Sequence, residues 1–298
     1  MVVYGGQTSN DEYLKDLRIL YFSGLEETPL LFSLFQNLTL IPADTSSWLK
    51  IQLNQSYPIA SARHASCLTE GNLYIHGGMT ANGISDQFCY FDFLSGWSAL
   101  HPQGPNPPPL YGHTLTYVPE TQNIYLFGGF STAGFSAKLY TYSLGEYFSC
   151  LFSFISCSIL SGFIFFKISR LSSETNHWTL LLGGGIAPPP TFGHVAIYHA
   201  LTASIYFHGG VRDLGLGAYA STSILVFNVL TKSWTTPLFS GYDRIHHAGT
   251  LVDNVIIFHG GFFPLTDTTA ANQCYYDEVF VYNICETSLL VLFFFPPR

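Results

Sequence analysis

Short apolar runs that end in a pair of glycines recur along this chain. The runs are VVYGG, LYIHGG, IYLFGG, IYFHGG and VIIFHGG, and their glycines are Gly5, Gly6, Gly77, Gly78, Gly128, Gly129, Gly209, Gly210, Gly260 and Gly261. The second glycines of successive pairs are 72, 51, 81 and 51 residues apart. Glycine permits a tight exit from a strand at positive φ, and a repeat of about 50 residues is typical of β-propeller blades. The pattern therefore predicts an array of β-rich repeats.

A tryptophan precedes each of the later glycine pairs at a nearly constant distance. The four tryptophans lie 30, 32, 32 and 27 residues before the second glycine of the next pair, and they are Trp48, Trp97, Trp178 and Trp234. Between tryptophan and glycines lies a third signal that ends in histidine, at 62–64, 111–113, 192–194 and 244–246. β-Branched and aromatic runs at 139–142 and 224–227 add another strand. Each repeat thus predicts four strands, with the tryptophan on the outermost, where its ring can cover the face between neighbouring repeats.

The glycine pair and the spaced tryptophan together resemble the kelch repeat, a four-stranded propeller blade. The resemblance covers most of the chain and implies an all-β, kelch-type propeller of about five four-stranded blades in residues 1–288, followed by an apolar tail at 289–298. The first blade is expected to lack its inner strand and to have no signal peptide before it, because Met1 directly precedes the first glycine strand. The last blade is expected to lack its tryptophan strand.

Two intervals between glycine pairs are longer than 51 residues, and both excesses lie between the third strand and the tryptophan. They place suspect insertions at about 20–36 and 145–173. The second contains Tyr147 to Phe166, a stretch without formal charge that is long enough to span a membrane. A span would separate strands of one blade that must hydrogen-bond to each other, since the repeat resumes at Glu174. We favour translated intron sequence, because Phe, Ser, Leu and Cys have pyrimidine-rich codons; a membrane segment and a long surface loop remain open.

Composition and charge narrow the class of partner. The chain has 298 residues, of which 48% are hydrophobic and 10% charged, and its net charge is −8. This composition fits one large folded domain. The sequence shows no Lys/Arg cluster, so nucleic-acid binding is not expected.

The six cysteines fall into pairs by position. Cys67 and Cys89 belong to the second repeat, the pair at 150 and 157 belongs to the suspect insertion, and Cys274 and Cys285 bracket the third strand of the last repeat. Cys67, Cys89, Cys274 and Cys285 are candidate disulfide partners; buried free thiols are the alternative. Two sequons, at Asn37 and Asn54, are candidate glycosylation sites and fit an extracellular setting.

The stretches QCYYDEVFVYNIC and YGHTLTYVPETQNIYLFGGFS narrow the resemblance. They resemble the extracellular kelch propellers of attractin and multiple-EGF-like-domain proteins, which are large secreted or single-span receptors. The resemblance implies a Cys274–Cys285 disulfide, an extracellular or ectodomain location and a binding module without catalysis. The chain lacks the EGF-like, CUB and plexin-type modules of that family.

Candidate catalytic residues are not apparent in this sequence. It contains neither a Gly-x-Ser-x-Gly elbow nor a phosphate-binding Gly-x-x-x-x-Gly-Lys loop. Most histidines recur at equivalent places in the repeats, which repetition explains better than a metal site does; His246 and His247 are the remaining metal candidate. We expect no cofactor and no enzyme activity.

Two alternative functions remain open. One is a copper enzyme like galactose oxidase, also a kelch-type propeller, whose centre needs two histidines, two tyrosines and a cysteine. The other is a cytosolic kelch adaptor that presents substrates to a ubiquitin ligase, for which free rather than disulfide-bonded cysteines are expected.

Binding is expected at the loops of one propeller face. Proline-rich connections at 101–110 and 186–191 lead into inner strands and stiffen the approach to them. Tyr111 and Phe192 follow these connections and are the candidate binding-face aromatics. The expected partner is a protein ligand, and a membrane is involved only if Tyr147 to Phe166 is a real span.

Overall fold

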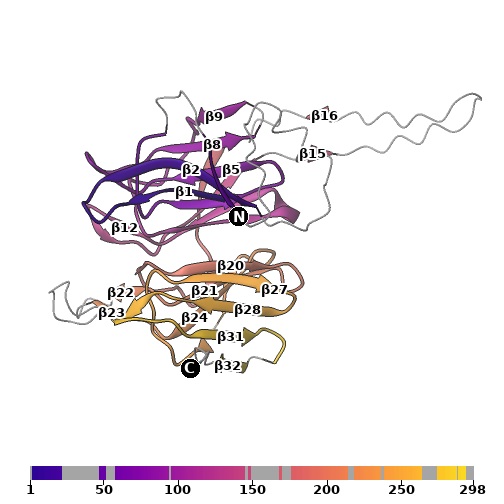
Figure 1. Cartoon of the computed structure of the whole chain (residues 1–298). Helices are drawn as coiled ribbons and strands as arrows, with labels where there is room; N and C mark the ends of the chain where they lie inside the picture. Colours follow the sequence, from indigo (N-terminus) through magenta and orange to yellow (C-terminus); the bar gives the residue numbers. More distant parts are fainter. Residues whose placement is uncertain are drawn as a thin grey trace, which may run out of the picture.

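The computed structural model describes residues 2–21, 47–51, 58–93, 95–144, 147–148, 168–169, 176–213, 218–235, 238–263, 274–286 and 288–292. This part of the chain is built almost wholly of β-strands, with one short 3₁₀ turn, η1 (Pro119–Thr121) (Figure 1). The all-β prediction is confirmed.

Antiparallel sheets follow one another along the chain, and we call them blades 1 to 5. Blade 1 contains β1 (Val2–Gln7), β2 (Tyr13–Tyr21) and β3 (Ser47–Ile51). Blade 2 contains β4 (Ala65–Leu68), β5 (Asn72–His76), β8 (Phe88–Asp92) and β9 (Gly96–Ala99). Blade 3 contains β10 (Thr114–Val118), β11 (Asn123–Phe127), β14 (Leu139–Ser143) and β17 (His177–Leu181).

The last two blades have the same strand order. Blade 4 contains β20 (Val195–His199), β21 (Ser204–His208), β24 (Ser223–Asn228) and β25 (Ser233–Trp234), with β26 (Leu238–Phe239) also on β24. Blade 5 contains β27 (Ala248–Val252), β28 (Val255–His259), β31 (Val279–Asn283) and β32 (Ser288–Leu292). The inner strands β4, β10, β20 and β27 lie side by side in that order, as Figure 1 shows for β20 and β27.

Short strands decorate the blades. After the glycine pairs lie β6 (Met79–Thr80) with β7 (Gly83–Ile84), β12 (Phe130–Ser131) with β13 (Gly134–Phe135), and β29 (Phe262–Phe263) with β30 (Cys274–Tyr275). In blade 4 the equivalent strand β22 (Val211–Asp213) pairs with both β19 (Thr191–Phe192) and β23 (Ala218–Ala220). The connection into blade 4 contributes β18 (Gly184–Gly185), which runs parallel to β25.

The apolar cores lie between successive blades rather than within one. One core joins blades 2 and 3, the next blades 3 and 4, and the third blades 4 and 5. Each described tryptophan reaches the preceding blade: Trp97 contacts Tyr4, Trp178 contacts His76, and Trp234 contacts Phe127. The predicted role of the tryptophans as covers between blades is confirmed for these three; the side chain of Trp48 lies outside the described part.

The two ends of the array differ from expectation in one respect. Among the described residues, the sheet of blade 1 has the order β1-β2-β3, with β1 at its inner edge, and the predicted incompleteness of this blade stays a prediction. The expectation that blade 5 loses its outer strand is wrong, because β32 pairs with β31 along its whole length. The run SLLVL supplies the backbone ladder without a tryptophan. The propeller therefore extends to residue 292, past the predicted boundary at 288.

The suspect insertions lie mostly outside the described residues. At the second insertion, β15 (Tyr147–Phe148) pairs with β16 (Ile168–Ser169), so the ends of this segment meet each other. The described residues contain no helix that is long and apolar enough to cross a membrane. The choice between intron, membrane segment and loop stays a prediction.

Candidate binding face at the inner strands

A three-residue turn leads into each inner strand, and its middle residue has a left-handed backbone. The middle residues are Arg63, Gly112, Gly193 and His246, with φ of +55, +63, +72 and +53°. The third residue is always a histidine, namely His64, His113, His194 and His247. The pattern of the repeats predicts His246 at that third position. This is wrong by one residue, because His247 faces Gly209 as His194 faces Gly128.

Backbone hydrogen bonds join the middle residues of these turns across the blades. Gly112 N–H donates to Arg63 O, Gly193 N–H to Gly112 O, and His246 N–H to Gly193 O, each at 2.8 Å. We call this chain of residues the inner ladder. Because every bond of the ladder joins neighbouring blades, it holds the turns of blades 2 to 5 together on one face.

Aromatic rings line the inner ladder. The Phe192 ring lies edge to face against Tyr111, with centroids 5.3 Å apart, and against His246, with centroids 5.2 Å apart. The Phe192 ring also covers Gly112, where an added Cβ would lie 2.4 Å from the ring. Glycine at this place in blade 3 therefore allows both the left-handed turn and the close approach of an aromatic ring from blade 4.

Three further phenylalanines extend the aromatic surface. Phe130 lies 5.5 Å from Tyr111, Phe135 lies 6.0 Å from Phe192, and Phe262 lies 5.9 Å from His246, measured between ring centroids. All these side chains are half-buried. We call the group the aromatic cluster: Tyr111, Phe130, Phe135, Phe192, His246 and Phe262.

The aromatic cluster contains both predicted binding-face residues and several that sequence reasoning missed. Tyr111 and Phe192 come together as neighbours, although 81 residues separate them. Phe130 and Phe262 were missed; each directly follows a glycine pair and bridges to the first residue of a turn, in the pairs Tyr111–Phe130 and Ile245–Phe262. The sequence could have indicated both residues, because each occupies the position directly after a glycine pair.

One positively charged residue, Arg63, belongs to the inner ladder. It occupies the first described position of the ladder, and its side chain is exposed. Burial, and to a lesser extent the positive charge of Arg63, lowers the pKa of His246 to about 4. His246 is therefore neutral at pH 7 and behaves as one more aromatic ring of the cluster.

The glycine pairs have two different packing roles. The first glycine faces the next blade: an added Cβ would lie 2.3 Å from Leu110 O at Gly77 and 2.5 Å from Thr191 O at Gly128. The second glycine faces the inner strand of its own blade, and at Gly129 an added Cβ would lie 2.7 Å from His113 Cβ. Both residues also have positive φ. Gly77, Gly128 and Gly129 thus allow close contacts that any side chain would block, whereas at Gly260 no described atom lies within 4 Å of an added Cβ.

Buried histidines join successive blades. His76 Nδ1 lies 3.0 Å from His113 Nε2, and His208 Nδ1 lies 2.9 Å from His247 Nε2. Burial lowers the pKa of His76 and of His247 to about 3, and it also lowers the pKa of His113 and His208. These histidines are neutral at pH 7, which lets one ring donate and the other accept.

The tautomers of the second pair follow from their neighbours. The Ser240 hydroxyl donates to Thr222 O at 2.6 Å, so its oxygen accepts from His208 Nε2–H at 2.9 Å. His208 Nδ1 is then an acceptor and His247 Nε2–H is the donor. This assignment leaves His247 Nδ1 without a proton, in agreement with its lack of a hydrogen-bond partner in the described part of the structure.

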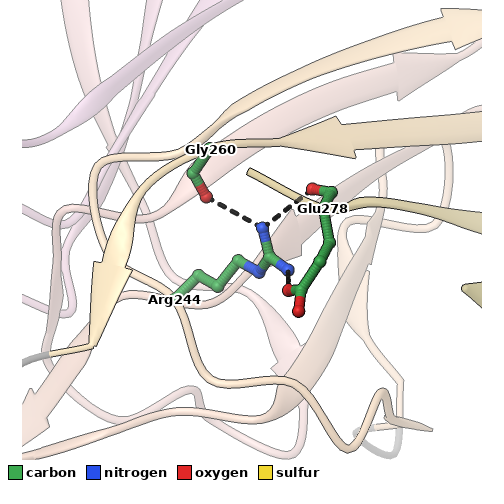
Figure 2. Close-up of polar contacts among 3 residues, drawn as sticks. All are labelled: Arg244, Gly260 and Glu278. Atoms are coloured by element: carbon green, nitrogen blue, oxygen red, sulfur yellow. Dashed lines mark hydrogen bonds and ion pairs between the residues drawn. The ribbon is translucent and has the colours of Figure 1, made fainter. Parts of the chain in front are cut away.

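A buried arginine fixes the turn of blade 5 (Figure 2). Arg244 is 1% exposed, and its Nη1 donates to Gly260 O at 3.0 Å and to Glu278 O at 3.2 Å. Its Nη2 donates to Glu278 Oε2 at 2.9 Å. The guanidinium also stacks over the rings of Tyr276 and Phe280. Arg244 lies two residues before His246, so this contact positions the end of the inner ladder.

Replacing Glu278 by Gln is expected to destabilise the protein by about 2 kcal/mol, because it leaves a buried guanidinium without its counter-ion while Glu278 itself is 35% exposed to solvent. Urea unfolding followed by circular dichroism measures the change. Asp277→Asn is the matched control, since Asp277 is exposed and the charge change is the same. Equal stability of the two variants would contradict the role given to Glu278.

The structure rules out one of the two predicted disulfides and leaves the other untested. Cys67 pairs with Tyr74, which pairs with Tyr90, whereas Cys89 pairs with Ile75. The two cysteines therefore point to opposite faces of blade 2 with β5 between them, and the register does not permit a Cys67–Cys89 disulfide. Cys285 is exposed and its thiol is free, while the side chain of Cys274 lies outside the described part. The Cys274–Cys285 bond stays a prediction, and Asn37 and Asn54 also lie outside the described residues.

The metal candidate His246–His247 is not assembled as a site. His246 points into the aromatic cluster, and His247 contacts His208 between blades. Within the described residues, no group of three or more His, Cys, Asp or Glu side chains could hold a metal ion.

Comparison with known proteins relates this chain to kelch propellers. The model of the Attractin/LZTR1 β-propeller family matches residues 151–292. Multiple epidermal growth factor-like domains protein 8 is 25% identical over 260 residues in Mus musculus, covering 83% of this chain and 8% of that protein. The Homo sapiens protein is 24% identical over 296 residues, covering 95% and 9%. Host cell factor of Drosophila melanogaster is 22% identical over 265 residues, covering 85% and 16%.

These similarities agree with the observed sheets. The fold is a kelch-type β-propeller that resembles attractin-like proteins, as the sequence predicted. The chain spans less than a tenth of the multiple-EGF-like-domain relatives, so the similarity concerns one part of those proteins. Relatives with kelch propellers support a protein-interaction module.

Proposed function

We propose that this chain is a non-catalytic module that binds a protein ligand through the aromatic cluster. The observation that carries the proposal is the gathering of six half-buried aromatic rings from blades 3, 4 and 5 on one face. Partly exposed aromatic residues provide large contact areas, and they dominate the energetics of protein interfaces. The rigid inner ladder beneath them keeps the loss of conformational entropy on binding small.

We further propose an extracellular setting, as a piece of an attractin-like receptor or secreted protein. The family match and the similarity to multiple-EGF-like-domain proteins support it. In that setting Asn37 and Asn54 would carry glycans, and Cys274 and Cys285 would form a disulfide. Peptide mapping of the secreted protein under non-reducing conditions tests this setting, and a reduced Cys274 in that material would contradict it.

A cytosolic kelch adaptor that presents substrates to a ubiquitin ligase is the second candidate. The exposed free thiol of Cys285 supports it. The same peptide mapping separates the two settings, because protein from the cytosol would keep both thiols reduced. A galactose-oxidase-type enzyme would instead hold copper after purification, and stoichiometric copper would contradict a purely binding role.

The binding role is tested by probing an array of purified extracellular domains with the folded chain and with variants of it. We expect at least one domain whose affinity falls tenfold or more on Phe192→Ala or Tyr111→Ala. Phe239→Ala is the matched control, because Phe239 is 82% exposed and lies outside the aromatic cluster. If every captured domain loses as much affinity with Phe239→Ala as with Phe192→Ala, the aromatic cluster is not the binding surface.

A further inference from the structure

A buried arginine beside the aromatic cluster departs from the pattern of the repeats. In blade 2 the second residue after the glycine pair is Thr80, whose hydroxyl donates to Gly83 O at 2.9 Å. In blade 3 it is Ser131, whose hydroxyl donates to Gly134 O at 3.2 Å. In blade 4 the same position is Arg212, which has no hydroxyl for this contact. The closing of a short hairpin therefore accounts for the threonine and the serine but not for the arginine.

Arg212 is buried, and no described carboxylate pairs with it. Its exposed fraction is 6%, and its Nε has no hydrogen-bond partner in the described part of the structure. Among the described residues, the buried Arg244 has Glu278 as its counter-ion, whereas no ion pair includes Arg212. Burial lowers the pKa of Arg212, and the neighbouring side chain of Tyr219 raises it. Arginine stays protonated in proteins, so a positive charge is held here at a cost in stability.

The surroundings of Arg212 are open to solvent on one side. Arg212 pairs with Thr191 of β19 and with Tyr219 of β23, so the three side chains lie on one face of this small sheet. Thr191 is 1% exposed, whereas Tyr219 is 43% exposed. A ligand group can therefore approach the guanidinium from the side of Tyr219.

Arg212 is also adjacent to the aromatic cluster. The residue before it, Val211, pairs with Phe192, a member of the cluster. Figure 1 shows β22 and β23 on the same side of the molecule as β12, the strand that contributes Phe130. Burial, and to a lesser extent the charge of Arg212, lowers the pKa of His194 to about 3. The field of the guanidinium thus reaches the turn that leads into β20, next to the inner ladder.

We propose that Arg212 binds an acidic side chain, aspartate or glutamate, of the protein that occupies the aromatic cluster. This inference rests on the binding role proposed above and specifies the chemistry of the partner. A guanidinium presents parallel N–H donors that fit a carboxylate, and their attraction is strong where little water is present. One guanidinium balances one negative charge, which favours a carboxylate over a phosphate group. The partner's carboxylate then provides the counter-ion that no described residue provides.

Replacing Arg212 by Met separates this role from a structural one, because Met keeps an apolar side chain and removes the charge. The free Arg212→Met protein is expected to unfold at a higher urea concentration than the unaltered protein, since a buried charge without a counter-ion has been removed. Arg244→Met is the contrasting variant, and it is expected to unfold at a lower urea concentration because it breaks the pair with Glu278. A loss of stability with Arg212→Met as large as with Arg244→Met would overturn the proposal.

A phage-displayed library of random peptides, selected on the full chain, is the probe for the chemistry of the ligand. We expect the selected peptides to combine aromatic residues with aspartate or glutamate, and Arg212→Met to weaken their binding by about tenfold or more. A synthetic copy with the acidic residue changed to its amide is expected to bind the unaltered protein and Arg212→Met equally, because both changes remove the same interaction. Arg63→Met is the matched control, since Arg63 is an exposed arginine of the same face.

The outcomes distinguish this inference from the binding role on which it rests. Peptides whose affinity falls with Phe192→Ala but not with Arg212→Met would overturn this inference alone. Failure to select any peptide, or affinities unchanged by Phe192→Ala, would overturn both. Selected peptides without acidic residues would contradict the role of Arg212, and so would an equal loss of affinity with Arg63→Met and Arg212→Met.

Discussion

Lowering the pH from 7.5 to 5 is expected to destabilise this protein by about 6 kcal/mol. The histidines between blades are buried, and burial is the first cause of the low pKa of each one, which is about 3 for His76, His194 and His247. The charges of Arg212 and Arg244, respectively, lower the pKa of His194 and His247 further. In the unfolded chain these groups titrate near pH 6.5.

The direction of the effect follows from these values. Between about pH 3 and 6.5 the unfolded state binds more protons than the folded state, so the free energy of unfolding falls as the pH falls through this range. Above pH 6.5 the histidines are neutral in both states and cause no loss of stability. At pH 5 each such histidine costs about 2 kcal/mol. The three named histidines together cost about 6 kcal/mol, which is comparable to the net stability of about 5–15 kcal/mol that is usual for a folded protein.

Urea unfolding at a series of pH values between 8 and 5 measures this loss. His76→Phe is the informative variant, because phenylalanine already occupies the equivalent position in blade 3, where Phe127 packs against His194 at 5.3 Å. The variant is expected to unfold with a shallower pH dependence, by about one proton, since one titrating group is gone. A stability that is constant from pH 7.5 to 5 would mean that these histidines are not held neutral by the fold.

Replacing Gly128 by Ala is expected to destabilise the protein by at least 3 kcal/mol more than replacing Gly260 by Ala. The two glycines occupy the same place in the repeat and have φ of +71° and +72°. Both substitutions therefore carry the same backbone strain of about 1–2 kcal/mol. At Gly128 the new Cβ would also lie 2.5 Å from Thr191 O and 2.7 Å from His194 Cε1, whereas at Gly260 no described atom lies within 4 Å.

The additional cost at Gly128 comes from separating two blades. The clash involves backbone and a buried ring, which cannot move aside as the end of a flexible side chain can. It also disturbs the hydrogen bond from Gly129 N–H to Thr191 O, which is 2.8 Å long. Chemical unfolding of the two variants side by side gives the difference directly. If Gly260→Ala destabilises the protein as much as Gly128→Ala does, backbone strain alone accounts for the loss of stability. The contact of Gly128 with the next blade would then contribute nothing to it.

The blades themselves were readable from the amino-acid sequence. Alternating apolar residues, the glycine pairs and the spaced tryptophans are local requirements of a four-stranded blade: period-two burial, a left-handed exit and a large ring for the next blade. These requirements act within one repeat, so each recurs in the sequence where it recurs in space. The fold class, most strands and the covering role of Trp97, Trp178 and Trp234 followed from them.

The binding face was only partly predictable. Tyr111 and Phe192 were named because they follow proline-rich connections, but the remaining members of the aromatic cluster come from strands after the glycine pairs. Their proximity depends on the bridges Tyr111–Phe130 and Ile245–Phe262, which join parts of a blade that are distant along the chain. The sequence pattern also assigned the third turn position of blade 5 to His246 instead of His247. Both residues are histidines, and only the contact of His247 with Gly209 in the structure shows which of them occupies that position.

Contacts between repeats account for the remaining features. β32 completes blade 5 because backbone pairing with β31 is satisfied by any extended apolar run, so the missing tryptophan was a poor guide. The Arg244–Glu278 pair and the opposite orientations of Cys67 and Cys89 depend on strand register, which a one-residue shift would reverse. Local patterns in the chain thus specify each blade, whereas the packing of one blade on the next places the aromatic cluster and the histidine pairs.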